Sequence, residues 1–133
     1  MHTILVIEDN AANMKLVTLL LNNAGYNTLF ATDAEAGIRL ARAERPDLIL
    51  MDLHLPGMDG LAATALLKQD PLTAAIPVIA LTAMASRIDE DNCRAAGCDA
   101  FIVKPLRYKI LYEAIDRLLA QRAPTTQPPQ PQP

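Results

Sequence analysis

Polar side chains that could do chemistry follow directly on four separate apolar runs of the sequence. Carboxylates gathered in one place repel one another unless a cation lies among them, and hard oxygen ligands suit Mg²⁺. A lysine opposite the acids would compensate their charge without the metal, and a nearby hydroxyl would supply a donor to an added anion. The group that would complete such a site is phosphate. The residues concerned are Glu8, Asp9, Asp52, Thr82 and Lys104.

Asp52 stands at the end of the most uniformly apolar of these runs. Residues 48–51 show no alternation, which is typical of a strand buried on both faces in a parallel sheet. The Pro-Gly and Asp-Gly steps in residues 53–60 indicate a loop. Asp52 is therefore expected at the carboxyl end of a strand, facing the crevice where open α/β sheets bind ligands. A lone Asp could instead cap the next turn, but the other polar strand ends favour a site.

Strands and helices alternate along the chain. Short apolar runs predict five strands, and apolar positions at helical spacing predict five helices between and after them. Thr32 and Glu35 have the spacing of a capping box, which predicts the start of the second helix. The strands are expected at 3–7, 26–31, 48–52, 76–82 and 100–103, and the helices at about 14–24, 32–43, 60–69, 86–96 and 110–119.

This alternation predicts an α/β fold, a flavodoxin-like doubly wound sheet of five parallel strands. Right-handed crossovers and a strand order of 2-1-3-4-5 place the ends of the first and third strands beside each other. Glu8, Asp9 and Asp52 would then share one crevice.

Length, composition and charge disfavour several classes of protein. The 133 residues fit one domain, expected over 1–122, and residues 123–133 form a Pro/Gln-rich stretch without large apolar side chains, expected as a disordered tail. The net charge of −3, without a basic cluster, disfavours nucleic-acid binding. No apolar run is long enough for a membrane span, and the N-terminus before Ile4 is too short to hold a signal peptide, so we expect a cytoplasmic protein. Cys93 and Cys98 lack the spacing of a zinc site and are expected as small apolar residues.

The polar residues, in their order and spacing, resemble the receiver domain of two-component response regulators. The resemblance rests on Glu8-Asp9, on Asp52 with the loop 56–60, on Thr82-Ala83 and on Lys104-Pro105. It extends from residue 3 to about residue 121. Residues 6–10 and 13–16 look most like the single-domain regulators that control cell-cycle kinases in alphaproteobacteria.

The resemblance implies a role for each site residue. Asp52 would accept a phosphoryl group from a phosphohistidine on a histidine kinase or a histidine phosphotransfer protein. The Mg²⁺ would be held by Asp9 and Asp52, by Glu8 through water and by the backbone carbonyl of His54. The phosphoryl oxygens would be bound by Lys104, by the hydroxyl of Thr82 and by the backbone N–H groups of His54 and Ala83. The Lys104-Pro105 peptide bond resembles one that is cis in the family.

The same resemblance implies a switch. Thr82 would move toward the phosphate, Phe101 would turn inward, and the surface of the fourth helix, fifth strand and fifth helix would change for a downstream protein partner. We expect a stand-alone receiver of a two-component system or a phosphorelay that catalyses only its own phosphorylation and dephosphorylation. The His54 side chain is either a determinant of phosphate lifetime or an ordinary exposed loop histidine.

Two other readings use the same residues. A receiver-like module could bind partners without phosphate, although the presence of Asp52, Thr82 and Lys104 disfavours this. A hydrolase with an aspartyl-phosphate intermediate would resemble D-x-D-x-T, whereas the sequence has His54 in place of the second acid.

Overall fold

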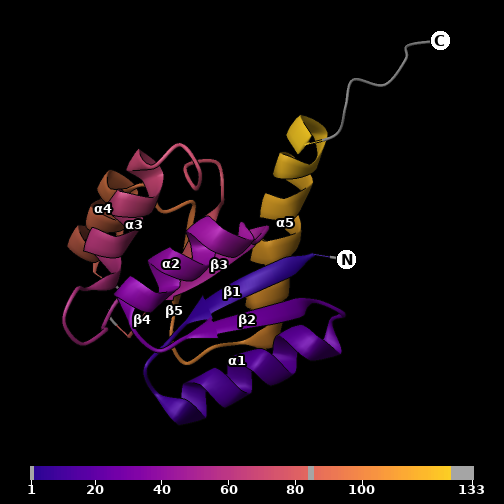
Figure 1. Ribbon diagram of the computed structural model, residues 1–133. Helices are drawn as coiled ribbons and strands as arrows, with labels where there is room; N and C mark the ends of the chain where they lie inside the picture. The colour runs from indigo at the N-terminus through magenta and orange to yellow at the C-terminus, as the bar shows by residue number, and fades with distance from the viewer. Residues whose placement is uncertain (1, 84–85, 127–133) are drawn as a thin grey trace.

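The computed structural model describes residues 2–83 and 86–126, with side chains up to Gln121. Five strands alternate with five helices along this part of the chain (Figure 1). The strands are β1 (Thr3–Ile7), β2 (Asn27–Ala31), β3 (Leu48–Asp52), β4 (Val78–Thr82) and β5 (Ala100–Val103). The helices are α1 (Ala11–Asn23), α2 (Ala34–Glu44), α3 (Gly60–Gln69), α4 (Arg87–Ala96) and α5 (Tyr108–Thr126).

The strands form one parallel sheet in the order β2-β1-β3-β4-β5, which confirms the predicted fold and strand order. In the register of β1 with β3, Ile7 pairs with Met51. The next residues along these strands, Glu8 and Asp52, therefore emerge at the same level of the sheet. The register, rather than either strand alone, brings the two acids together.

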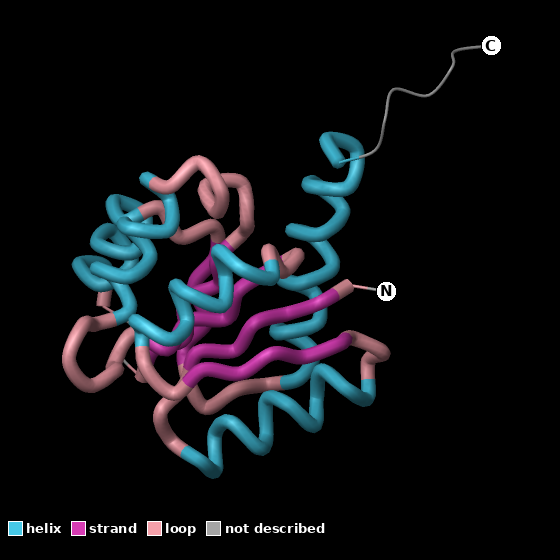
Figure 2. Tube along the Cα trace, in the orientation of Figure 1, coloured by secondary structure: helices cyan, strands magenta, loops and turns pink. Residues whose placement is uncertain are grey.

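Helices cover both faces of the sheet (Figure 2). Along β1 the side chains alternate between two apolar cores, as a strand buried on both faces requires. Leu5 and Ile7 pack with apolar residues of α2, α3 and α4. Ile4 and Val6 pack with apolar residues of α1 and α5. The central strand β3 and its neighbour β4 are buried along their whole length, so the residues at their ends are held by a rigid support.

Several element boundaries differ from those predicted. The N-cap of α2 is Asp33, whose side chain accepts from the N–H of Ala36 at 2.8 Å, so the predicted capping box at Thr32 is wrong. Both residue types are good caps, and local spacing did not separate them. Strand β4 begins after Pro77, which has no N–H to donate, although its carbonyl accepts from Ile49.

The C-terminal helix is longer than its apolar stripe predicted. α5 continues to Thr126 and includes the first four residues of the expected tail. The rest of that tail, residues 127–133, lies outside the described residues. None of the helices in the described part of the chain combines the length and apolar character of a membrane-spanning segment.

Candidate functional site

Three carboxylates meet at the carboxyl edge of the sheet, as the sequence predicted. Glu8 and Asp9 follow β1, and Asp52 ends the neighbouring strand β3. One oxygen from each carboxylate lies within 4.8 Å of the other two. Glu8 and Asp52 are 1% and 3% exposed, whereas Asp9 is exposed. The cluster therefore has a buried floor of two acids and a third acid at its rim.

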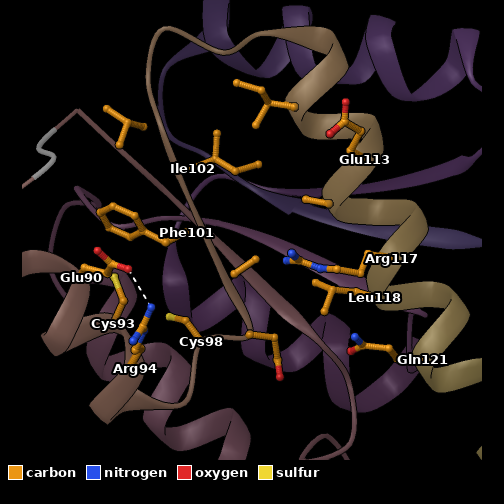
Figure 3. A pocket seen from close by; sticks show the side chains of 15 residues that line it. Glu90, Cys93, Arg94, Cys98, Phe101, Ile102, Glu113, Arg117, Leu118 and Gln121 are labelled. Atoms are coloured by element: carbon orange, nitrogen blue, oxygen red, sulfur yellow. Dashed lines mark hydrogen bonds and ion pairs between the residues drawn. The ribbon is translucent and has the colours of Figure 1, made fainter.

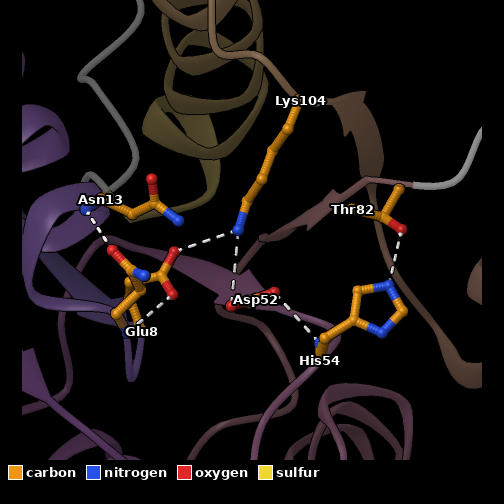
Figure 4. A network of polar contacts seen from close by, with 7 residues as sticks. Glu8, Asn13, Asp52, His54, Thr82 and Lys104 are labelled. Carbon is orange, nitrogen blue, oxygen red and sulfur yellow. Dashed lines mark hydrogen bonds and ion pairs between the residues drawn. The ribbon is translucent and has the colours of Figure 1, made fainter.

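Lys104 reaches this floor from the segment that follows β5 (Figure 4). Its Nζ lies 3.2 Å from Glu8 Oε1 and 3.5 Å from Asp52 Oδ2. The ammonium thus lies within ion-pair distance of both buried carboxylates and compensates part of their charge. The Lys104-Pro105 peptide bond is cis, as the resemblance implied.

The environment separates the pKa values of the two buried acids. Burial, followed by a hydrogen bond with Asp52, raises the pKa of Glu8 from an ordinary value near 4.5 to about 7, against the opposing effects of the Asn10 N–H and Lys104. Burial alone would also raise the pKa of Asp52, but hydrogen bonds from Glu8 and the His54 N–H, together with Lys104, bring it below its ordinary value. At neutral pH Asp52 is therefore ionised, while Glu8 is only partly ionised.

The loop after β3 brings His54 to both Asp52 and Thr82. The backbone N–H of His54 donates to Asp52 Oδ1 at 3.0 Å. The ring Nε2 of His54 lies 3.3 Å from Oγ1 of Thr82, a hydroxyl residue at the end of β4 that is 1% exposed. Ala83 follows Thr82 directly and is exposed. The structure therefore brings together Asp52, His54, Thr82 and Lys104, and it adds a contact through the His54 ring.

Two residues of the site, Asn10 and Gly60, were not predicted from the sequence. Asn10 is the N-cap of α1, and its N–H donates to Glu8 Oε2 at 3.2 Å. Gly60 begins α3 so close to β3 that an added Cβ would contact the carbonyl oxygen of Asp52 and lie 2.8 Å from the Cα of Leu53. Asn10 could have been found as a helix cap two residues after Glu8. The Asp-Gly step indicated only a turn at Gly60, because the close approach arises from tertiary packing.

The donor set fits a hard divalent cation. All three side chains offer carboxylate oxygens, and one ammonium, that of Lys104, lies within ion-pair distance of the two buried acids. Mg²⁺ prefers such oxygen ligands and keeps part of its own water shell. A site with two buried acids and one at the rim leaves one side open to solvent and to an additional ligand.

Comparison with known proteins identifies this combination of sheet and site. A family model of the response regulator receiver domain matches residues 4–116, a range that includes every site residue described above. The chain belongs to this family. Receiver domains are signalling modules of two-component systems rather than classical enzymes.

Relatives and solved structures agree with the family. The chain is 43% identical over 117 residues to the polar-differentiation response regulator DivK of Brucella anthropi, covering 88% of this chain and 95% of that protein. It is 34% identical to the receiver domain of the sensor histidine kinase PA1611 of Pseudomonas aeruginosa, which has a magnesium ion coordinated in its active site cleft. That match has a TM-score of 0.84 and covers 90% of this chain and 98% of the other. A CheY-like receiver domain protein of Methanospirillum hungatei matches with 27% identity and a TM-score of 0.87, covering 94% and 98%.

Proposed function

We propose that Asp52 accepts a phosphoryl group from the phosphohistidine of a histidine kinase or histidine phosphotransfer protein, in the presence of Mg²⁺. The observation that carries this proposal is the Asp52 carboxylate, which is buried and ionised beside Lys104 at the floor of an acidic cluster. A phosphate acceptor must be ionised to attack phosphorus, and the lowered pKa of Asp52 keeps it so at neutral pH.

The transfer is a single displacement at phosphorus. An oxygen of Asp52 forms the new O–P bond, the N–P bond of the phosphohistidine breaks, and the departing imidazole nitrogen keeps the electron pair. Little covalent chemistry is left for the protein, so catalysis rests on position and charge. Lys104 would move its ion pair from the carboxylates to a phosphoryl oxygen. The hydroxyl of Thr82 and the backbone N–H groups of His54 and Ala83 would bind the other oxygens.

The residues that would hold Mg²⁺ are Asp9, Asp52, Glu8 through water, and His54 through its backbone carbonyl. When bound, the ion neutralises the negative charge that the phosphoryl group brings to three carboxylates. The magnesium ion in the PA1611 receiver domain supports this assignment. A bound cation would favour the ionised form of Glu8, because a nearby positive charge opposes the burial and the hydrogen bond with Asp52 that raise its pKa.

We assign the output to the face formed by α4, β5 and α5. A groove of about 1020 Å³ lies there, with Phe101 toward α4 and Arg117 on α5 (Figure 3). Phe101 is half-buried, three residues before Lys104, and pairs in the sheet with Ala80. The Lys104 N–H donates to the carbonyl of Thr82 at 2.7 Å, which ties the end of β4 to the end of β5. A movement of Thr82 toward the phosphate would reach Phe101 and the groove through this connection.

The downstream partner of this face is a protein, bound more tightly in one phosphorylation state than in the other. The match to 95% of the length of DivK supports output through the receiver domain itself. We propose that residues 1–122 form the receiver domain and carry out the phosphotransfer. The Pro/Gln-rich tail at 123–133 takes no part in it. A cytoplasmic location fits Cys93 and Cys98, which are both free thiols.

Intact mass spectrometry tests the proposal. The protein is incubated with acetyl phosphate, or with phosphoramidate, whose P–N bond resembles that of phosphohistidine, with and without Mg²⁺. We expect one added phosphoryl group that requires Mg²⁺ and is lost in Asp52→Asn but retained in Asp91→Asn, a matched change at an exposed acid of α4. Uptake by the Asp52→Asn variant contradicts the assignment of the acceptor. Absence of uptake from both donors, and from a panel of phosphorylated histidine kinases, favours the phosphate-independent module.

A further inference from the structure

The contact between the His54 ring and the Thr82 hydroxyl joins an exposed side chain to a buried one. His54 Nε2 and Thr82 Oγ1 are 3.3 Å apart, and Figure 4 shows the hydroxyl directed at the ring. Both residues line an open cleft of about 510 Å³, with the exposed His54 ring at the solvent side. The ring can therefore leave the contact without disturbing the core.

The backbone on either side of His54 directs its ring to this place. Leu53 and Leu55 are both buried, 8% and 7% exposed. The N–H of Leu53 donates to the carbonyl of Leu81 at 3.0 Å, which continues the pairing of β3 with β4 for one more residue. Both leucines belong to one apolar core, whereas His54 between them is exposed and therefore lies on the other side of the loop. That side holds the cleft and the end of β4, where Thr82 stands.

Thr82 has one hydroxyl proton to donate. If Nε2 accepts that proton, a phosphoryl oxygen and the ring compete for it directly. If Nε2–H donates, the ring still fixes the position of Oγ1, and the hydroxyl must leave the ring to reach the phosphate. In either tautomer the movement proposed for Thr82 breaks the contact with His54.

We propose that His54 is a positioning residue that holds the Thr82 hydroxyl in its unphosphorylated orientation and thereby opposes the switch. This inference rests on the proposed function, since it concerns regulation of the same phosphate site. His54 stabilises the resting arrangement, so phosphorylation must overcome the loss of one hydrogen bond. A neutral hydrogen bond corresponds to roughly a two- to tenfold change in an equilibrium constant.

The test is the affinity of the Mg²⁺-loaded protein for beryllofluoride, a mimic of the phosphoryl group on an aspartate, measured by isothermal titration calorimetry. His54→Leu removes the hydrogen bond at an exposed position, and we expect about two- to tenfold tighter binding. His54→Gln keeps a side-chain amide that can hydrogen-bond to Thr82, and we expect it to stay within about twofold of the original protein. A methyl resonance of Thr82 in the free protein should shift in His54→Leu and be restored toward its original position in His54→Gln.

Repeating the measurement with Thr82→Val separates positioning from any direct effect of His54 on the ligand. Valine keeps the shape of threonine and removes the hydroxyl, so His54→Leu should no longer change the affinity in this background. An unchanged or weaker affinity of His54→Leu overturns the inference, and so does a gain that persists when Thr82→Val is also present. If the original protein fails to bind beryllofluoride, the proposed function fails together with the inference. Binding that depends on Asp52 but not on His54 removes the inference alone.

Discussion

Lys104 Nζ lies 3.2 Å from Glu8 Oε1, across 96 positions of the sequence, and 3.5 Å from Asp52 Oδ2. One ammonium thus contacts two buried carboxylates that would otherwise repel each other. Glu8 and Asp52 share this single positive charge. Burial and the hydrogen bond with Asp52 raise the pKa of Glu8, so that Glu8 retains a proton near neutral pH, while hydrogen bonds from Glu8 and the His54 N–H, together with Lys104, keep Asp52 ionised.

Replacement of Lys104 should leave the repulsion between the carboxylates of Glu8 and Asp52 uncompensated. In Lys104→Met the pKa of Glu8 should rise further, and the free energy of unfolding at pH 8 without metal should fall by about 1 to 3 kcal/mol. We place the loss below that of a fully buried ion pair because the Lys104 side chain is 21% exposed. Urea unfolding followed by circular dichroism measures the change.

The matched control for this loss is Lys15→Met, at an exposed position of α1. Mg²⁺ should recover part of the stability lost in Lys104→Met, because the ion replaces the missing positive charge. Equal stability of the two variants at pH 8 would contradict the charge role of Lys104.

Stability without metal should decrease as the pH rises through neutrality. The pKa of Glu8 is raised in the folded state to about 7 from an ordinary value near 4.5. Its contribution is fully present below pH 4.5 and is lost as the pH rises through 7, and the loss is on the order of 3 kcal/mol. Asp52 acts in the opposite sense at lower pH, since its pKa is lowered and its contribution is lost on acidification.

Urea unfolding in EDTA between pH 5 and pH 8 measures this dependence. Glu8→Gln removes the titrating group and should flatten the profile over that interval. If the free energy of unfolding falls equally steeply with pH in Glu8→Gln, another titrating group is responsible for the decline. With saturating Mg²⁺ the decline should also diminish in the original protein, because the ion stabilises the charged form of Glu8.

Asp9 should affect metal binding far more than stability. Because Asp9 is exposed, Asp9→Asn should change the free energy of unfolding without metal by only about 0.5 kcal/mol. It removes one of three carboxylate charges from the cluster, so Mg²⁺ affinity should fall by about tenfold or more. Calorimetric titration of Mg²⁺ at pH 8 compares this variant with Asp91→Asn. Equal affinities in the two variants would exclude Asp9 as a ligand.

Gly60 should be required for both the fold and the acceptor. An added methyl group would press on the backbone of Asp52 and Leu53, so Gly60→Ala should lower the free energy of unfolding by about 1 to 3 kcal/mol. The comparison is Gly37→Ala, for which the three heavy atoms nearest to the added methyl group all belong to the side chain of Ile7 on β1 rather than to backbone. At a temperature where both variants are folded, phosphoryl uptake should fall in Gly60→Ala and persist in Gly37→Ala. Normal uptake in Gly60→Ala would show that the backbone adjusts without moving Asp52.

The order of elements was predictable because the signals are local. The apolar run at residues 48–51 and the turn residues after it identify a buried strand and its end without knowledge of the rest of the chain. The resemblance to receiver domains then assigned Asp52, Thr82 and Lys104 to one site. The fold and family are confirmed, and the structure brings the three residues together.

Other features depended on distances between segments far apart in the sequence. The position of Gly60 against Asp52, the proton retained by Glu8 and the contact of His54 with Thr82 each result from packing. Sequence determines which side chains are available and where each strand ends, because apolar periodicity and turn chemistry act over a few residues. Only the tertiary structure decides which groups share a proton or a hydrogen bond, because these interactions change over tenths of an ångström between segments that the sheet register brings together.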